Sequence, residues 1–250
     1  MTEMELLIDF HKDAERQGPG SNEDTLKALG FLSIDNSIQL KVADIGCGSG
    51  AQTIVLAQNL NTKITAVDLF PEFLDKLNAN AEKLGLQDKI LTLQKSMDDL
   101  PFDKEEFDII WSEGAIYIIG FEDGIKKWKD YLKIGGYIAL SEITWTNNSR
   151  PKEIEEHWNA EYPQINTASN KIKILEKNGF SPVGYFYLPE NSWINNYYQP
   201  IEDRIDNFLK KHNNSDLAKG IVEAEQNEIN KYRNYKDFLS YGFYIARKVR

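Results

Sequence analysis

The sequence predicts an α/β protein with a doubly wound, seven-stranded, mostly parallel sheet and a helical insertion before the last strand. Three observations predict this class. Short apolar runs alternate with helical patterns through roughly the first two thirds of the chain. A strand, a helix and a strand follow one another with the spacing of a β-α-β unit. About fifty residues with helical apolar spacing separate the last two candidate strands.

Seven apolar segments are candidate strands because they are short, rich in β-branched or aromatic residues and bounded by turn signals. They are residues 42–46, 63–68, 90–95, 107–112, 137–143, 183–188 and 241–249. Between the second and third, Pro71 suits the first turn of a helix and Gly85 its C-terminal cap. The apolar stripe of that helix consists of Phe73, Leu74, Leu77, Ala81 and Leu84.

Further helix boundaries follow from glycines and capping residues. The pair Gly135-Gly136 is predicted to follow a helix over residues 121–132 and to turn the chain into the fifth strand. Another helix is expected over residues 171–178, ending at Gly179.

The chain is predicted to begin with helices. Ser21 with Asp24 has the spacing of a capping box that opens a helix near the N-terminus. Together these patterns divide the chain into four parts. They are an N-terminal helical segment (1–37), an α/β domain (38–189), a helical insertion (190–240) and the closing strand (241–250).

Composition excludes several classes of protein. With 29 Lys and Arg against 39 Asp and Glu, the net charge of −10 gives no broad positive field for nucleic acid or an anionic membrane. One cysteine, Cys47, and three scattered histidines make a disulfide or a metal site unexpected. No apolar run has the length of a signal core or a membrane span, so a cytoplasmic protein is expected.

The strongest local signal is the segment 42–50, VADIGCGSG, in which a buried strand leads into Gly46, Gly48 and Gly50 and then into a helix over 51–60. Glycines allow a tight turn and a close approach of the backbone to a ligand, and the helix presents free N–H groups at its start. The loop therefore predicts a site for a nucleotide-like cofactor. A glycine-rich turn without a ligand is the alternative.

Asp68 strengthens the cofactor prediction. It ends the next strand, 18 residues past Gly50, where a carboxylate can accept hydrogen bonds from two ribose hydroxyls. An exposed, solubilising aspartate is the alternative. Gly46, Gly48 and Ala51 also satisfy a loose dinucleotide pattern, so spacing alone leaves a nicotinamide cofactor open.

In detail the chain resembles class I S-adenosylmethionine-dependent methyltransferases, in the small-molecule, methyltransferase type 11-like branch. The likeness rests on Asp44 two residues before Gly46, on the third glycine, on Leu100-Pro101-Phe102, and on the long excursion before a final strand. It covers roughly residues 38–189 and the closing strand. It implies a Rossmann-like methyltransferase fold and S-adenosylmethionine as the cofactor.

The resemblance also implies roles for residues of the first two strands. The three loop glycines would lie against the methionine part of the cofactor, with Asp44 near its amino group. Asp68 would hold the ribose hydroxyls, and Leu69 would pack on the adenine.

Two later segments match the family as well. Ser96 stands where the family usually has an Asp; its hydroxyl can still bond the adenine amino group, and Asp98 is a possible substitute. Met97 would supply a backbone N–H and an apolar wall, or simply pack in the core. Glu113, after the fourth strand, would face the cofactor's amino group or the substrate.

The function implied is in-line methyl transfer to a small-molecule acceptor, with no nucleic acid or membrane partner and a possible homo-oligomer. A general base is optional because alignment supplies much of the rate, so the catalytic residues stay unknown. If a base is used, Glu113, Glu142 and His157 are candidates. An NAD(P)-dependent oxidoreductase, disfavoured by the absence of an obvious Tyr-x-x-x-Lys pair, and a noncatalytic S-adenosylmethionine sensor are the alternatives.

Two groups of residues are expected on the substrate side. An aromatic set caps a pocket over the sheet or forms the core of a helical subdomain. Its members are Trp145, Trp158, Trp193, Tyr197 and Tyr198. The segment 16–20, RQGPG, is a lid over the cofactor or an ordinary loop.

Overall fold

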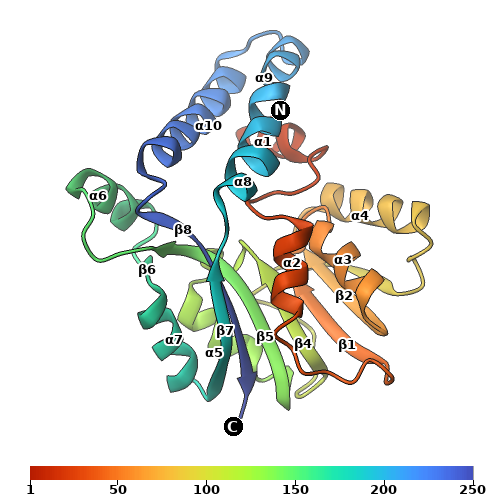
Figure 1. Ribbon diagram of the computed structural model, residues 1–250. Coiled ribbons are helices and arrows are strands. Elements are labelled where there is room, and N and C mark those ends of the chain that lie inside the picture. Colours follow the sequence, from red (N-terminus) through yellow and green to blue (C-terminus); the bar gives the residue numbers. More distant parts are fainter. Residues whose placement is uncertain (250) are drawn as a thin grey trace.

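The computed structural model describes residues 1–249 of the 250-residue chain, and its centre is one β-sheet. The strands are β1 (Leu40–Ile45), β2 (Thr62–Asp68), β3 (Ile90–Gln94), β4 (Phe107–Glu113), β5 (Leu132–Trp145), β6 (Asn166–Thr167), β7 (Phe180–Tyr187) and β8 (Leu239–Lys248). Seven of them follow the order β3-β2-β1-β4-β5-β8-β7, and the short β6 pairs with β5 beside this path (Figure 1). Only β8 runs antiparallel to its neighbours β5 and β7. The predicted fold class is confirmed.

Ten α-helices and two short helical turns surround the described sheet. The helices are α1 (Glu3–His11), α2 (Asn22–Leu29), α3 (Ala51–Asn59), α4 (Pro71–Lys83), α5 (Phe121–Lys129), α6 (Lys152–Glu161), α7 (Ala168–Lys177), α8 (Glu190–Trp193), α9 (Gln199–Lys211) and α10 (Asp216–Tyr235). The turns are η1 (Ile116–Ile118) and the π-helical η2 (Ile194–Tyr198), which joins α8 to α9.

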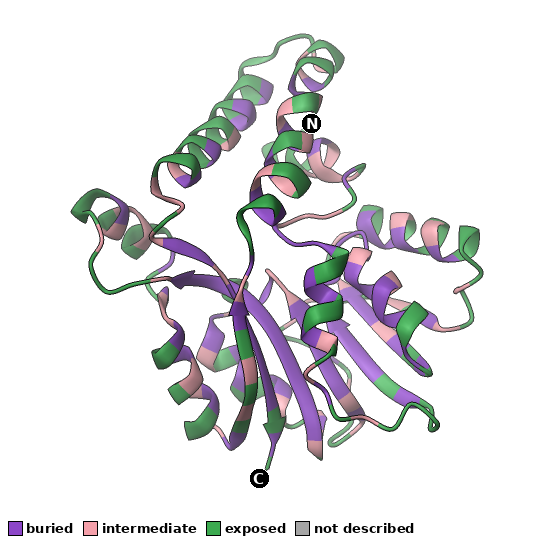
Figure 2. Cartoon of the chain, in the orientation of Figure 1, coloured by how far each residue is buried: buried purple, intermediate pink, exposed green. Residues whose placement is uncertain are grey.

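Alternate residues of the strands face opposite cores, as the two-residue period of a strand requires. Val42 and Ile109 pack with α2, α3 and α4 on one face, whereas Ala43 and Ile110 pack with α5 and α7 on the other. The central strands are therefore buried on both faces (Figure 2). This explains why they read in the sequence as continuous apolar runs.

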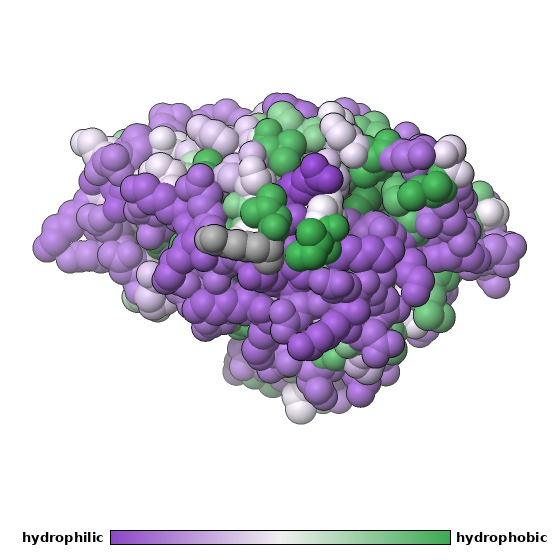
Figure 3. Space-filling view, turned by 90° about the horizontal axis from the view of Figure 1, so that it is seen from below, coloured by the Kyte–Doolittle hydropathy of each residue, from purple (hydrophilic) through white to green (hydrophobic). Residues whose placement is uncertain are grey.

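A third apolar cluster lies beyond the sheet. It joins Phe10 of α1 and Ile221 of α10 with Trp193, and with Ile143 and Leu239 from the ends of β5 and β8 that meet there. We call α1, α8, η2, α9 and α10 together the helical cap; it lies over the carboxyl ends of the parallel strands (Figure 1). Polar side chains cover most of the opposite end of the molecule (Figure 3). The four-part division of the chain stays a prediction, and α1 packs with the insertion rather than apart from it.

The structure corrects the expectations around the fifth strand. α5 ends at Lys129, and β5 begins at Leu132 rather than at residue 137. Leu132 already pairs with Phe107, and a register shift before Ile109 accommodates the glycine pair within the strand. The glycines therefore distort β5 instead of preceding it. α6 and β6, which follow β5, were not predicted.

The N-terminal cap prediction is half right. Ser21 accepts a hydrogen bond from the Asp24 N–H, as an N-cap should. The Asp24 carboxylate, however, accepts from the hydroxyls of Ser21 and Ser192 (2.8 and 2.5 Å), and so fixes α2 to α8. A full capping box occurs instead between Thr2 and Glu5 at the start of α1.

Candidate functional site

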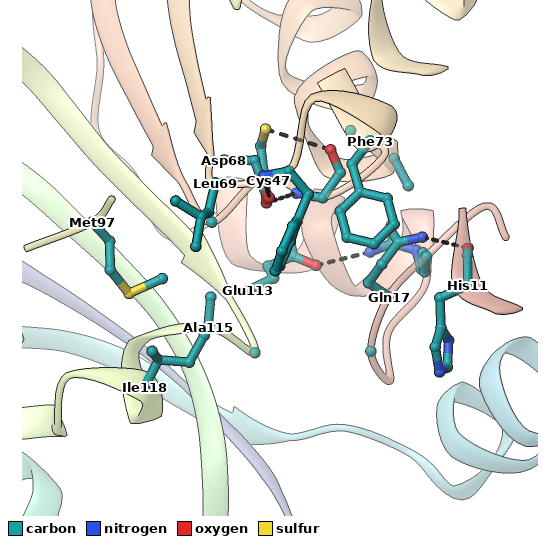
Figure 4. A pocket seen from close by; sticks show the side chains of 18 of the residues that line it. His11, Gln17, Cys47, Asp68, Leu69, Phe73, Met97, Glu113, Ala115 and Ile118 are labelled. Carbon is teal, nitrogen blue, oxygen red and sulfur yellow. Dashed lines mark hydrogen bonds and ion pairs between the residues drawn. The ribbon is translucent and has the colours of Figure 1, made fainter. Parts of the chain in front are cut away.

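A cavity of about 470 Å³ lies where β1, β2 and β4 end beneath the helical cap (Figure 4). We call it the loop cavity because the glycine loop forms one wall. Eight of the nine residues predicted to bind the cofactor line it: Gly46, Gly48, Gly50, Asp68, Leu69, Ser96, Met97 and Glu113. Its volume falls within the range of small-molecule sites. Thus residues from four separate segments are brought to one site, although no bound molecule tests their roles.

The glycine loop is a turn that other side chains could not form. Gly46, Gly48 and Gly50 have φ values of 74°, 54° and 80°, in the left-handed region. A Cβ on Gly50 would lie 2.2 Å from Leu77 Cδ1, and one on Gly46 would lie 2.4 Å from Ala115 Cβ. Close packing against the protein itself therefore requires two of the glycines, in addition to any approach of a ligand.

Asp68 joins the tip of β2 to the glycine loop. Its Oδ2 accepts from the Gly48 N–H (2.8 Å), and its Oδ1 accepts from the Phe70 N–H (3.0 Å). Burial raises the pKa of Asp68, and these backbone hydrogen bonds oppose the rise. Because each carboxylate oxygen has two lone pairs, Asp68 keeps acceptor capacity toward the cavity.

Asp44 is the predicted residue that does not line the cavity. Its side chain is fully buried, and its Oδ2 accepts from Thr53 Oγ1 (2.5 Å) while Gln52 Nε2 lies 3.4 Å from its Oδ1. Burial raises the pKa of Asp44 to about 7, and the negative charge of Glu113 adds to the rise. The carboxyl group therefore fixes the first turn of α3 to β1, and its predicted contact with a cofactor amino group has no support from the cavity lining.

The segment after β3 forms another wall. Met97 lines the loop cavity and also packs against the core, where its carbonyl accepts from Trp128 Nε1 (3.0 Å); its predicted contact with an adenine ring stays a prediction. Ser96 lines the cavity and donates to Asp98 Oδ1 (2.5 Å). Asp98 is exposed and outside the lining, so it is not placed to substitute for the family's usual Asp.

Glu113 binds the N-terminal segment to the end of β4. Its carboxylate accepts from Arg16 (2.9 Å), from the Thr25 hydroxyl (2.7 Å) and from Trp111 Nε1 (2.9 Å). Both oxygens are thus occupied, one of them by a permanently charged guanidinium. This arrangement suits a structural clamp better than a general base.

The segment 16–20, predicted to be a lid or an ordinary loop, contacts the glycine loop through Gln17. Gln17 Oε1 accepts from the Ser49 N–H (2.9 Å) and hydroxyl (2.8 Å), and Gln17 Nε2 donates to the His11 carbonyl (3.0 Å). Figure 4 shows Gln17 and His11 across the cavity from Met97, Ala115 and Ile118. The N-terminal segment therefore forms a wall of the cavity.

A second cavity of about 470 Å³, which we call the aromatic cavity, lies between the sheet and the cap. Trp158, Trp193, Tyr197 and Tyr198 line it, whereas Trp145 packs in the adjoining apolar cluster. All five pack in or against the core of the cap, and the four other than Trp145 also form the cavity wall. The two cavities adjoin at residues that line both: Gln17, Gly18, Pro19, Gly114, Tyr117, Tyr197 and Glu228.

The other two candidate bases, His157 and Glu142, differ in whether they line a cavity that a substrate could enter. His157 lines the aromatic cavity, with its Nδ1 2.9 Å from Lys231 Nζ; burial, and then the Lys231 charge, lower the pKa of His157. Glu142 lines neither cavity and is fully buried with Lys171 and Tyr162, which both donate to it. Glu142 therefore cannot reach a substrate in either cavity.

Two acidic residues of α10 face the site, and neither of them was identified from the sequence as a site residue. Glu225 lines the loop cavity and Glu228 lines both cavities. A signal did exist: the two acids continue the spacing of Ile221 and Tyr232 along one helix face. Carboxylates on an apolar stripe indicate an inward-facing polar site.

Comparisons with known proteins find relatives of the part of the chain that forms this site. A model described as a methyltransferase domain matches residues 42–136, which contain the glycine loop, Asp68 and Glu113. An uncharacterized protein of Haemophilus influenzae is 31% identical over 60% of this chain and 59% of its own length. A geranyl diphosphate 2-C-methyltransferase of Streptomyces ambofaciens is 22% identical over 72% of the chain and 60% of its own length. The chain thus spans less than two thirds of these relatives.

Among solved structures, an S-adenosylmethionine-dependent methyltransferase from Geobacter sulfurreducens, in complex with S-adenosyl-L-homocysteine, superposes with a TM-score of 0.85. The superposition covers 98% of both chains at 17% sequence identity, so it bears on the fold. Together the matches confirm the resemblance predicted from the sequence. Within residues 1–249, no helix combines the length and apolar character needed to cross a membrane.

Proposed function

We propose, from a methyltransferase domain at residues 42–136 set in the fold of class I S-adenosylmethionine-dependent methyltransferases, that this chain transfers a methyl group from S-adenosylmethionine to a small-molecule acceptor. One observation carries the proposal. The loop cavity and the aromatic cavity meet at Gly114, Tyr117, Tyr197 and Glu228. A donor held in the first and an acceptor held in the second would meet at that junction.

The residues of the loop cavity fit an adenosyl sulfonium. Asp68 offers free lone pairs for ribose hydroxyls beside the Gly48 backbone. Leu69 is 52% exposed at the cavity wall, and with Met97 it offers an apolar surface for an adenine ring. Acidic and aromatic groups at the junction, Glu228 and Tyr197 among them, suit a sulfonium cation.

Methyl transfer requires little from the protein beyond the placement of the methyl donor and the acceptor. S-adenosylmethionine, when bound, supplies an electrophilic methyl group. The glycine loop and Asp68 would hold the nucleoside, and the cap helices would exclude water from the junction. Orientation of two reactants can supply roughly 7–11 kcal/mol of barrier reduction, so no base is required in principle. Glu113, clamped by Arg16, would keep the N-terminal wall closed.

Thermal unfolding with added ligands tests this function. S-adenosyl-L-homocysteine is expected to raise the melting temperature, since a ligand at 100 times its Kd stabilises the native state by about 2.7 kcal/mol. NAD is expected to leave it unchanged. Stabilisation by NAD alone would overturn the proposal. Stabilisation by S-adenosyl-L-homocysteine without methyl release to any of a broad metabolite panel would identify a sensor instead.

Asp68→Ala is expected to weaken binding of S-adenosyl-L-homocysteine by roughly 1.5–3 kcal/mol, because it removes a charged hydrogen-bond acceptor. Calorimetric titration measures the change, after far-UV circular dichroism has verified folding. Asp68→Asn keeps an acceptor for the Gly48 N–H and is expected to lose less. Asp75→Ala, at an exposed residue of α4 outside the cavity, is the control. A folded Asp68→Ala protein with unchanged affinity would refute the ribose assignment.

A further inference from the structure

Glu228 is an exposed acidic residue of α10 whose carboxylate forms no ion pair within residues 1–249. It lines both cavities from the inner face of α10. Its Oε1 accepts one hydrogen bond, from the Tyr198 hydroxyl (3.1 Å), and within residues 1–249 no Lys, Arg or His lies within 4.0 Å of it. A cationic group bound beside it would therefore gain an ion pair.

The other charged groups nearby already have partners. Glu225 binds His11 (2.8 Å), so the acid one turn away on α10 is engaged. Lys231, three residues after Glu228 on α10, also lines the aromatic cavity, and its ammonium donates to His157 Nδ1 (2.9 Å) rather than to Glu228. Desolvation by the surrounding residues and the charge of Glu225 raise the pKa of Glu228, whereas the Tyr198 hydrogen bond and the charge of His11 oppose the rise. Because the pKa is raised on balance, added positive charge beside this carboxylate is favourable.

Aromatic rings surround the same space. Tyr117, Tyr197 and Tyr241 line the aromatic cavity, and within the described chain their hydroxyls form no hydrogen bond. Burial raises the pKa of all three phenols, and the Glu228 charge adds to each rise, which places them around one carboxylate. The ring of Trp193, edge-on to Tyr241 at 4.8 Å, forms another wall. Aromatic faces with one carboxylate are the recognition chemistry of ammonium groups.

We propose that the aromatic cavity binds an amine-bearing small molecule, with its nitrogen against Glu228 at the junction of the two cavities, and that this nitrogen is the atom methylated. This inference rests on the proposed function. An acceptor whose reacting end is a carboxylate or a diphosphate would meet the negative charge of Glu228.

The reaction balances with the groups present. The bound ammonium gives one proton to the Glu228 carboxylate, which leaves a neutral nitrogen with a lone pair. That pair forms the new nitrogen–carbon bond as the methyl carbon–sulfur bond breaks, and the breaking pair stays on sulfur as a neutral thioether. The methylated nitrogen carries the positive charge, and Glu228 later releases its proton to water. The raised pKa of Glu228 suits this proton transfer.

The test measures thermal stabilisation in saturating S-adenosyl-L-homocysteine. The probes are amines with phenyl, indolyl, cyclohexyl and linear skeletons, each paired with the alcohol and the carboxylate of the same skeleton. Amines are expected to add a further rise in melting temperature that the paired alcohols and carboxylates lack. In Glu228→Gln the concentration of amine for half-maximal stabilisation is expected to rise roughly 10- to 100-fold.

Controls separate this inference from the proposed function. Glu223→Gln changes an exposed acid of α10 outside both cavities and is expected to behave as the unaltered protein. Glu228→Gln is expected to keep stabilisation by S-adenosyl-L-homocysteine, because the sulfur of that ligand is a neutral thioether and not the sulfonium that Glu228 would face. No response to any amine, an equal response to the alcohols or carboxylates, or full amine binding by Glu228→Gln would overturn the amine site while leaving the cofactor proposal intact. Loss of the S-adenosyl-L-homocysteine response in the unaltered protein would overturn the cofactor proposal instead.

Discussion

Lys171→Met is expected to lower the free energy of unfolding by about 3–5 kcal/mol, because it leaves the Glu142 carboxylate buried without its cation. Both side chains have no exposed surface. The Lys171 ammonium donates to Glu142 and to the Gln164 carbonyl, and it lies 4.4 Å from the ring centroid of Phe121. Tyr162 donates to the same carboxylate. The network joins β5 to α7, so its loss is expected to destabilise the packing of α7 on the sheet.

Urea unfolding followed by circular dichroism measures this change. Lys173→Met, at an exposed position of α7, controls for the loss of charge. Glu142→Gln combined with Lys171→Met removes both charges, while the introduced amide oxygen still accepts from the Tyr162 hydroxyl. This double variant is expected to recover most of the loss. A cost below about 1 kcal/mol for Lys171→Met alone would show that Glu142 is neutral in the fold.

Asp44→Asn is expected to remove a stability loss that the unaltered protein suffers as pH rises. Burial raises the pKa of Asp44 from 3.8 to about 7, so the folded state holds a proton that the unfolded state has released. Stability from this group is therefore full below about pH 4 and declines up to about pH 7. Between pH 5 and pH 8 the unaltered protein is expected to lose roughly 3 kcal/mol relative to the Asn variant.

Denaturant unfolding at several pH values measures that difference. Other acids with raised pKa values, including Asp68 and Glu228, cancel in the comparison because both proteins contain them. Asp75→Asn, at an exposed position of α4, is expected to follow the unaltered protein. Parallel curves for the unaltered protein and Asp44→Asn would mean that Asp44 ionises normally inside the fold.

Much of the candidate site could be predicted because its signals are local. The strand, the glycine loop and α3 form one continuous segment, and Asp68 ends the strand that pairs next to it. The positive φ values of Gly46 and Gly50 belong to a turn within a few residues, whereas their close packing against Ala115 and Leu77 depends on the tertiary fold. The start of the fifth strand was predicted less well, because Gly135-Gly136 is typical of a turn. Only pairing with β4 keeps β5 continuous from Leu132.

The sequence by itself determined the α/β class, the glycine loop and the carboxylate at the tip of β2, because each depends on residues close together in one β-α-β unit. Only the tertiary structure decided that Asp44 is buried behind the glycine loop. It also decided that Glu228, 160 residues after Asp68, lines the loop cavity together with Asp68. Burial and charge balance depend on which distant elements pack together. The helical cap brings α10 to the sheet, and no local pattern encodes that contact.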